Sequence, residues 1–246
     1  MTEAQEPGYD DREQTLLEHL LELRSRLLKV IAGVLVFTLA LLPFSRQLYT
    51  WLAEPLMRHL PESSSMVAID VATPFLTPFK LTLMAGLLLA MPWIIYQLWA
   101  FVAPGLYRND KHLAKPLLLS STALFYLGCA FAYFVVFPVV FAFFTSVAPA
   151  GVSVMTDISR YLTFVLTLFF AFGIAFEVPI AIIILVALRV TTVRQLRSWR
   201  PYVVVGAFAV GMLLTPPDVI SQTLLALPMW VLYEVGLVMA RFVTSQ

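Results

Sequence analysis

Six long apolar stretches constrain the fold of this chain more than any other feature of its sequence. A helix needs about 20 mostly apolar residues to cross the hydrocarbon core of a bilayer. The composition agrees with a bilayer environment, since 60% of the residues are hydrophobic, 13% are charged and the mean hydropathy is +0.86. We therefore predict an all-α membrane protein with six transmembrane helices. They lie at about 27–44, 81–101, 116–144, 161–188, 202–216 and 222–240.

The last two predicted spans are short. The fifth apolar run, 202–214, has 13 residues, which reach roughly 20 Å at about 1.5 Å per residue, against a core of about 30 Å. The sixth also reads as short, and a Pro-Pro-Asp turn at 216–218 separates the two. One interpretation is a re-entrant hairpin. We favour two full but short spans, because thinning the bilayer costs only fractions of a kcal/mol per Å.

Lysine and arginine are distributed unequally between the two sides of these spans. Short cytoplasmic loops carry an excess of both residues. Twelve of the 16 basic residues fall on the side of the two termini and four on the other, which predicts that both termini are cytoplasmic. The four are Arg46, Arg58, Lys80 and Arg160.

The domain organisation follows from the spans. We expect an acidic tail at 1–14, a single membrane domain at 15–243 and a short C-terminal end at 244–246. The first outer connection, 45–78, combines a helical pattern with four prolines and predicts short helices that form an ordered lid. Prolines within or beside spans, at 92, 138, 179 and 228, favour kinked helices in a curved, cupped bundle.

Two acidic residues lie inside predicted spans, where ionisable groups are costly and so suggest function. Glu177 in the fourth span is a candidate for a hydrated cavity, and the alternative is a hydrogen-bonded carboxyl that holds helices together. Glu234 in the sixth span has the same two interpretations.

A polar patch surrounds the turn between the last two spans. It consists of Met212, Thr215 and Gln222. Such a patch is able to bind a partner helix through interhelical hydrogen bonds, or to cap helix ends near the membrane interface. The residues alone leave both interpretations open.

Glu22 lies in a helical run at 15–30, just before the first span. Its simplest role is an i,i+4 ion pair with Arg26, worth a few tenths of a kcal/mol. Asp110, in the next cytoplasmic loop, is ordinarily a solvated charge. If Glu22 and Asp110 converge, two carboxylates would suit a ligand with adjacent guanidinium groups, because arginine binds carboxylate through two parallel hydrogen bonds.

Enzyme signatures are missing from the sequence. It has no P-loop, no nucleophile elbow and no HExxH motif, and its three histidines lie outside the spans. The single cysteine, Cys129, excludes a disulfide within the chain. A net charge of +1 gives no basis for nucleic-acid binding. We therefore expect a membrane protein that is not an enzyme and needs no metal or cofactor.

Six motifs, in this order and spacing, resemble the TatC family over about residues 15–243. They are HLLELRSRLL (19–28), WAFVAPGLY (99–107), FAYFVVFP (131–138), FGIAFEVP (172–179), RPYVVVGAFAVGMLLTPPD (200–218) and SQTLLALPM (221–229). The resemblance implies a receptor in the bacterial inner membrane that binds the paired arginines of signal peptides on folded precursor proteins. It also implies TatA, TatB and further TatC copies as partners, and transport driven by the proton-motive force.

Site residues follow from the resemblance, position by position. The signal-recognition positions fall on Glu22, Arg24, Phe101, Leu106 and Asp110, and Pro55 and Asp70 belong to the periplasmic lid. Glu177 and Asp218 match the buried and turn acids, and the single-span partners are implied to dock near Met212, Thr215 and Gln222. Asp110 departs from the family, whose common pattern has glutamate there, and its reach is one methylene shorter.

Two other functions compete with this interpretation. A proton-coupled transporter of small solutes would use Glu177 and Glu234. The sequence has no visible likeness between halves of the kind that many transporters show, which lowers the expectation for this class. A scaffold that positions other membrane helices would bind partners without binding signal peptides.

Overall fold

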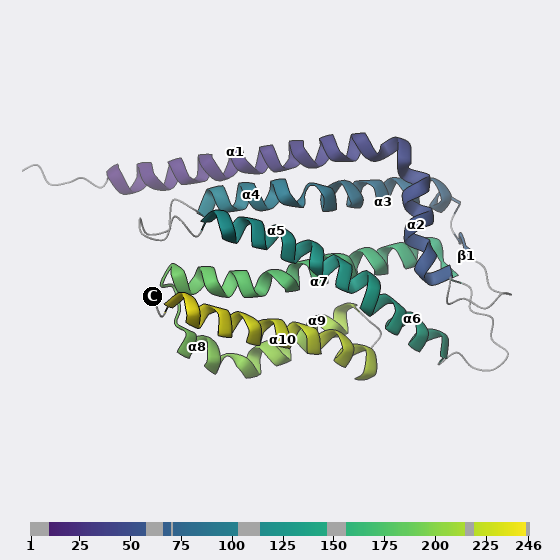
Figure 1. Ribbon diagram of the computed structural model, residues 1–246. Helices are drawn as coiled ribbons and strands as arrows, with labels where there is room; N and C mark the ends of the chain where they lie inside the picture. Colours follow the sequence, from purple (N-terminus) through teal and green to yellow (C-terminus); the bar gives the residue numbers. More distant parts are fainter. Residues whose placement is uncertain are drawn as a thin grey trace, which may run out of the picture.

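A computed structural model of the chain describes residues 10–57, 66–69, 71–102, 114–146, 156–214 and 219–244. Long helices lie side by side and run between two ends of a bundle (Figure 1). At one end α1 begins, α4 ends and α10 ends, and we call it the α8 end. The opposite end, which holds α2, is called the α2 end.

Most of the described residues belong to helices that run between these ends. These helices are α1 (Asp10–Leu41), α3 (Thr73–Leu89) followed by α4 (Met91–Val102), α5 (Ala114–Phe131) followed by α6 (Phe137–Ser146), α7 (Ile158–Ala187), α9 (Arg200–Leu214) and α10 (Val219–Thr244). The shorter elements are η1 (Leu42–Phe44), α2 (Ser45–Met57), β1 (Met66–Val67), the π-helical turn η4 (Ala132–Val136), β2 (Thr156–Asp157) and α8 (Val193–Ser198).

Length and apolar composition make this a multi-pass membrane protein. Within the described ranges, four helical stretches are long and apolar enough to cross a membrane, and the bent pair α3–α4 makes five. The remaining predicted span corresponds to α9, an apolar helix of 15 residues that reaches roughly 22 Å. Each predicted span thus has a helix in the structure, and the fifth is short as expected.

The second span begins earlier than the sequence suggested, and it is bent. We expected 81–101, with Pro74 and Pro78 in the outer connection, but both prolines lie within α3. Pro74 is tolerated because the first N–H groups of a helix have no intrahelical partner. The helix axis then bends by 47° between α3 and α4. Pro92 follows this break, and its missing N–H explains why the helix does not continue straight.

The prediction of a short sixth span was wrong. Helix α10 has 26 residues, and its apolar part, Gln222–Phe242, has 21. Two polar side chains lie within this helix. Both are satisfied by α9, since Gln222 donates to the carbonyl oxygen of Phe208 at 2.8 Å and Glu234 accepts from Arg200. The helix therefore continues through them.

Helix α7 is the centre of the bundle, and α5 and α10 pack closely against it. Glycines permit this approach. A Cβ on Gly128 of α5 would lie 2.5 Å from the carbonyl oxygen of Phe172, and one on Gly236 of α10 would lie 2.9 Å from the Cα of Pro179. Small residues at such contacts let helix backbones approach in a membrane. Aromatic side chains fill the space beside them, with Phe125, Phe137 and Phe172 fully buried.

Short elements lie at the α2 end. Helix α2 packs against α3 and α6, and the two-residue strands β1 and β2 pair in parallel. Asp157 caps α7 by accepting from the backbone N–H of Arg160 at 2.8 Å. The predicted helix in the first outer connection is therefore present as α2, whereas residues 58–65 and Asp70 lie outside the described part of the chain.

We predict that the contact between α1 and α3 does not tolerate a methyl group at Gly86. A Cβ there would lie 2.3 Å from Oγ1 of Thr38 and 2.8 Å from its backbone nitrogen, so Gly86→Ala should destabilise the protein by about 1–3 kcal/mol. Unfolding of the purified protein by titration with sodium dodecyl sulfate would measure this.

Gly206→Ala is the matched control, because nothing lies within 4 Å of a Cβ built at Gly206. Alanine is favoured over glycine in a helix by up to about 1 kcal/mol, so this variant should unfold at an equal or higher detergent fraction. Equal destabilisation by both variants would contradict the close α1–α3 contact.

Candidate functional site

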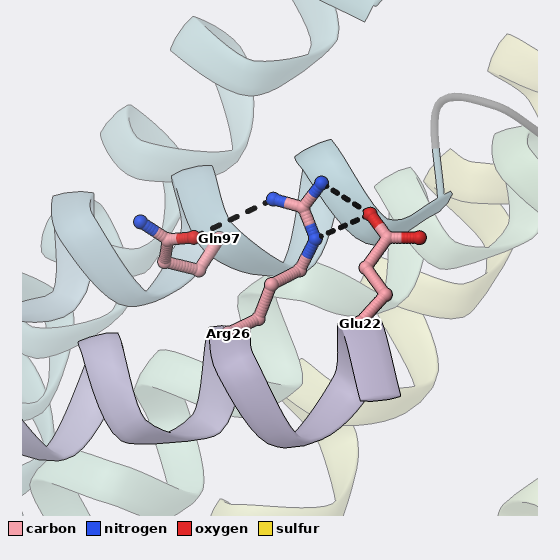
Figure 2. Close-up of polar contacts among 3 residues, drawn as sticks. All are labelled: Glu22, Arg26 and Gln97. Carbon is pink, nitrogen blue, oxygen red and sulfur yellow. Dashed lines mark hydrogen bonds and ion pairs between the residues drawn. The ribbon is translucent and has the colours of Figure 1, made fainter. Parts of the chain in front are cut away.

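Three polar side chains join α1 to α4 near the α8 end (Figure 2). Arg26 donates to Oε1 of Glu22 from Nε at 2.8 Å and from Nη2 at 2.5 Å. This confirms the i,i+4 pair expected from the sequence. The same guanidinium also reaches Oε1 of Gln97 at 3.5 Å, and Gln97 is 4% exposed. A buried amide on α4 therefore contacts the arginine that binds Glu22.

Glu22 keeps one carboxylate oxygen turned outward. Both bonds from Arg26 go to Oε1, and Oε2 points away from the guanidinium in Figure 2. The side chain of Glu22 is 37% exposed and that of Arg26 is 21% exposed. Among the residues that the structure describes, Arg26 thus binds one carboxylate oxygen of Glu22 and leaves the other turned away from it.

Phe101 lies at the level of Glu22. Helices α1 and α4 run in opposite directions (Figure 1), so Glu22 lies one turn beyond Arg26 and Phe101 one turn beyond Gln97, both toward the α8 end. Phe101 is half-buried in α4. The structure therefore brings Glu22 and Phe101 to one region. Leu106 and Asp110 follow in a connection outside the described residues.

Arg24 lies on another face of α1. It is two residues from Glu22 and so roughly 200° around the helix. Arg24 lines an open groove together with Lys29 and small or apolar side chains of α1. The structure does not bring Arg24 together with Glu22 and Phe101.

Glu177 lies at the contact between α5 and α7. Oγ of Ser121 donates to its Oε2 in a short hydrogen bond. The other oxygen, Oε1, is buried and has no hydrogen-bond partner among the described residues. Glu177 therefore bonds across helices, as one of its two interpretations expected, and it also keeps an unsatisfied acceptor inside the protein.

A groove runs along the same face of α7 toward the α2 end. Its volume is about 430 Å³, and Met84 of α3 and Thr163, Thr167 and Phe170 of α7 line it. Lys80 closes its outer part and donates to Oγ1 of Thr163 at 2.9 Å. Phe170 and Glu177 are seven residues apart, so they share a helix face and Glu177 continues the line of the groove.

Glu234 belongs to a different helix pair. It forms an ion pair with Arg200, which joins α10 to α9, and the side chains are 25% and 45% exposed. Glu177 and Glu234 therefore have separate partners at separate helix contacts among the described residues.

The two described members of the polar patch near the last turn, Met212 and Gln222, differ in their surroundings. Gln222 is engaged within the chain through its bond to Phe208, and Met212 is 55% exposed on α9. Thr215 and Asp218 lie outside the described residues. In the predicted lid, Pro55 lies in α2 and Asp70 is not described.

Sequence reasoning missed the partners that orient the three candidate acids. These partners are far from the acids along the chain. The separation is 75 positions between Glu22 and Gln97, 56 between Glu177 and Ser121, and 34 between Glu234 and Arg200. One signal was available, because Gln97 and Ser121 are polar residues within predicted spans, where such residues seek partners on other helices. The sequence held no information on which acid each would meet.

Comparison with known proteins gives a consistent assignment. The family model described as TatC, Sec-independent protein translocase protein, matches residues 18–228. A relative from Azotobacter chroococcum with the same name is 58% identical over 226 residues, covering 92% of this chain and 89% of the relative. The protein of that name from Escherichia coli K12 is 56% identical over 229 residues, covering 93% and 89%.

Solved structures agree. A crystal structure described as the twin arginine translocase receptor TatC superposes with a TM-score of 0.82 at 36% identity, covering 92% of this chain and 99% of that one. A second structure of that receptor, in the detergent DDM, gives a TM-score of 0.81 at 35% identity, covering 90% and 99%. With a family match and relatives above 50% identity across nearly its whole length, this chain belongs to the TatC family of Sec-independent protein translocase proteins.

Proposed function

We propose that this chain is the signal-peptide receptor and core subunit of a twin-arginine translocase. Family membership supports this role, and the solved structure it matches is described as a twin arginine translocase receptor. The single observation that carries the proposal is Glu22, a carboxylate fixed by Arg26 with one oxygen turned outward.

The chemistry of Glu22 suits arginine. A guanidinium in the ligand donates to Oε2 while Arg26 retains Oε1, so the carboxylate is shared between two arginines. Charge-assisted hydrogen bonds of this kind are about twice as strong as neutral ones. The planar guanidinium keeps further N–H donors for the second carboxylate, and the ammonium of lysine does not reproduce that planar arrangement. Asp110 is the second proposed carboxylate, and Phe101 and Leu106 supply apolar contacts beside the arginines.

The proposed orientation places the α8 end in the cytoplasm. The excess of Lys and Arg on the side of the two termini supports it, as does the position of the α1 start and the C-terminus at one end of the bundle (Figure 1). The location is the bacterial inner membrane, and α2 with Pro55 and Asp70 forms the periplasmic lid. Six spans then cross, with α9 locally thinning the bilayer.

Later steps are assigned to the interior and to partner subunits. Glu177, with its unsatisfied oxygen, lines the path of the inserted precursor beyond the groove between α3 and α7. TatA and TatB dock near Met212, Thr215 and Gln222, other TatC copies complete the assembly, and the proton-motive force drives export.

The first prediction concerns Glu22. Glu22→Ala should weaken binding of a twin-arginine signal peptide by about 1.5–3 kcal/mol, the range for a hydrogen bond to a charged group. Photocross-linking of the peptide from a position beside Glu22, over a range of peptide concentrations, measures the change. A twin-lysine peptide should cross-link weakly to the unaltered protein.

Glu18→Ala is the matched control, because Glu18 is an exposed carboxylate one turn away on α1. Its cross-linking to the twin-arginine peptide should equal that of the unaltered protein within experimental error. Equal cross-linking by twin-arginine and twin-lysine peptides, or no effect of Glu22→Ala, would remove Glu22 from recognition.

The second prediction separates binding from transport. Glu177→Ala should leave signal-peptide cross-linking intact and lower the rate of precursor export into inverted membrane vesicles. Ser121→Ala should give a smaller defect in the same step, since it removes the donor to Glu177. Thr122→Ala is the control, because that hydroxyl bonds to Leu118 of its own helix at 3.1 Å. Loss of initial binding in Glu177→Ala would place this acid at an earlier step.

A further inference from the structure

Arginines gather on the α8 end around the last four helices. From residue 189 to residue 241 the chain carries five of them, and all are exposed. They are Arg189, Arg194, Arg197, Arg200 and Arg241. The acids in this stretch are Glu234, which is paired with Arg200, and Asp218 in the turn between α9 and α10, outside the described residues. Arg189 and Arg241 also have interactions within the chain, so Arg194 and Arg197 of α8 are the exposed cations that matter most on this surface.

Helix α8 holds two of these arginines in fixed positions. Thr192 and Gln195 form a capping box at its start, and Leu196 is 2% exposed on its inner side. Oη of Tyr233 donates to the carbonyl oxygen of Leu196 at 2.6 Å, which ties α8 to α10. Arg194 and Arg197 are three residues apart and share the outer face. Both arginines therefore belong to a helix that packs against α10 at the α8 end of the bundle.

Simpler explanations do not account for this arrangement. A topology signal requires only positive charge in a loop and needs no capped and anchored helix. The helix dipole favours cations near a C-terminus, which suits Arg189 after α7, but Arg194 lies in the first turn of α8, where a cation is disfavoured. An anion outside the chain would compensate the charges that α8 holds at Arg194 and Arg197.

Aromatic residues place this surface at headgroup depth. Trp199, directly after α8, is 50% exposed, and Tyr202 on α9 is 76% exposed. Exposed tryptophan and tyrosine concentrate where hydrocarbon meets the headgroup region. Arg194 and Arg197 are close to both aromatic residues in sequence, so headgroup depth for Trp199 and Tyr202 would bring the two arginines near lipid phosphates.

We propose that α8 and the adjoining arginines form a binding surface for the headgroups of anionic phospholipids in the leaflet at the α8 end. Clusters of four to eight basic residues next to a transmembrane helix bind acidic lipids. The lipid phosphate accepts from Arg194 and Arg197, while its acyl chains lie beside the exposed apolar surface of α9. The site is separate from Glu22 and does not depend on signal-peptide recognition.

The test is lipid retention by the purified full-length protein. Detergent-solubilised protein is mixed with equal amounts of phosphatidylglycerol and phosphatidylethanolamine, and native mass spectrometry counts each bound lipid. Arg194→Gln with Arg197→Gln should lower the preference for phosphatidylglycerol about tenfold. Replacement of both arginines by lysine should largely preserve it, because the phosphate is attracted by charge.

The matched control is Arg46→Gln with Arg160→Gln, which removes two exposed arginines from the other end of the molecule. This variant should keep the preference. An unchanged preference in the α8 variant, or an equal loss in the control, would overturn the proposal. An unchanged lipid preference together with lost binding of a partner protein would also overturn it and would assign the surface to an acidic protein segment.

Salt dependence keeps the proposal testable if the glutamine variant does not fold. In the unaltered protein, about 0.5 M ammonium acetate should remove most of the phosphatidylglycerol preference, because exposed charges are screened within a few Å at such concentrations. A preference that persists at this salt concentration would overturn the proposal. Cross-linking of a twin-arginine peptide near Glu22 is measured on the same samples, so the outcome for lipid is read independently of the receptor function.

Discussion

Close backbone contact around α7 is the constraint on which the remaining structure depends. Lipid tails are as apolar as the side chains inside the bundle, so membrane helices associate through packing and interhelical hydrogen bonds rather than through exclusion of apolar surface from water. Gly128 and Gly236 bring α5 and α10 against α7 from different helices, at distances that no side chain would allow. These two contacts set where Ser121 meets Glu177 and where Tyr233 meets α8. The positions of the buried acid and of the basic surface at the α8 end both follow from glycine packing.

Polar side chains within the spans then act as pairwise links between neighbouring helices. Arg26 reaches Gln97 between α1 and α4, Ser121 reaches Glu177 between α5 and α7, and Gln222 reaches Phe208 between α9 and α10. Each bond satisfies a polar group that would otherwise face hydrocarbon. Interhelical hydrogen bonds of this kind stabilise a membrane protein by about 0.6 kcal/mol on average. Their contribution to specificity exceeds their contribution to stability, because each bond forms in one register of its helix pair. The same bonds orient the carboxylates proposed to function.

Local patterns predicted most of the helices and little of the site. The apolar stretches predicted a helix for each span, and the four-residue spacing of Glu22 and Arg26 predicted their ion pair. Both signals lie within about 20 residues of sequence. Pro92 indicated a kink, which the structure has after Leu89, whereas the early start of α3 and the full length of α10 were missed. Both depend on how prolines and polar side chains are accommodated by neighbouring helices. The partners of the acids were missed for the same reason, because no local pattern encodes which helices become neighbours. The resemblance to TatC supplied site positions, and it did so without the contacts that orient them.

The arrangement suggests how recognition and the buried acid are connected. Gln97 of α4 contacts Arg26, which binds Glu22, while Ser121 of α5 binds Glu177. Helices α4 and α5 are joined by the connection 103–113, which carries Leu106 and Asp110, both proposed to contact the signal peptide. Ser121 lies two helical turns after the first residue of α5. Under the proposed function, the residues of this connection that contact the peptide and the donor to the buried carboxyl therefore belong to one continuous stretch of chain, 97–121.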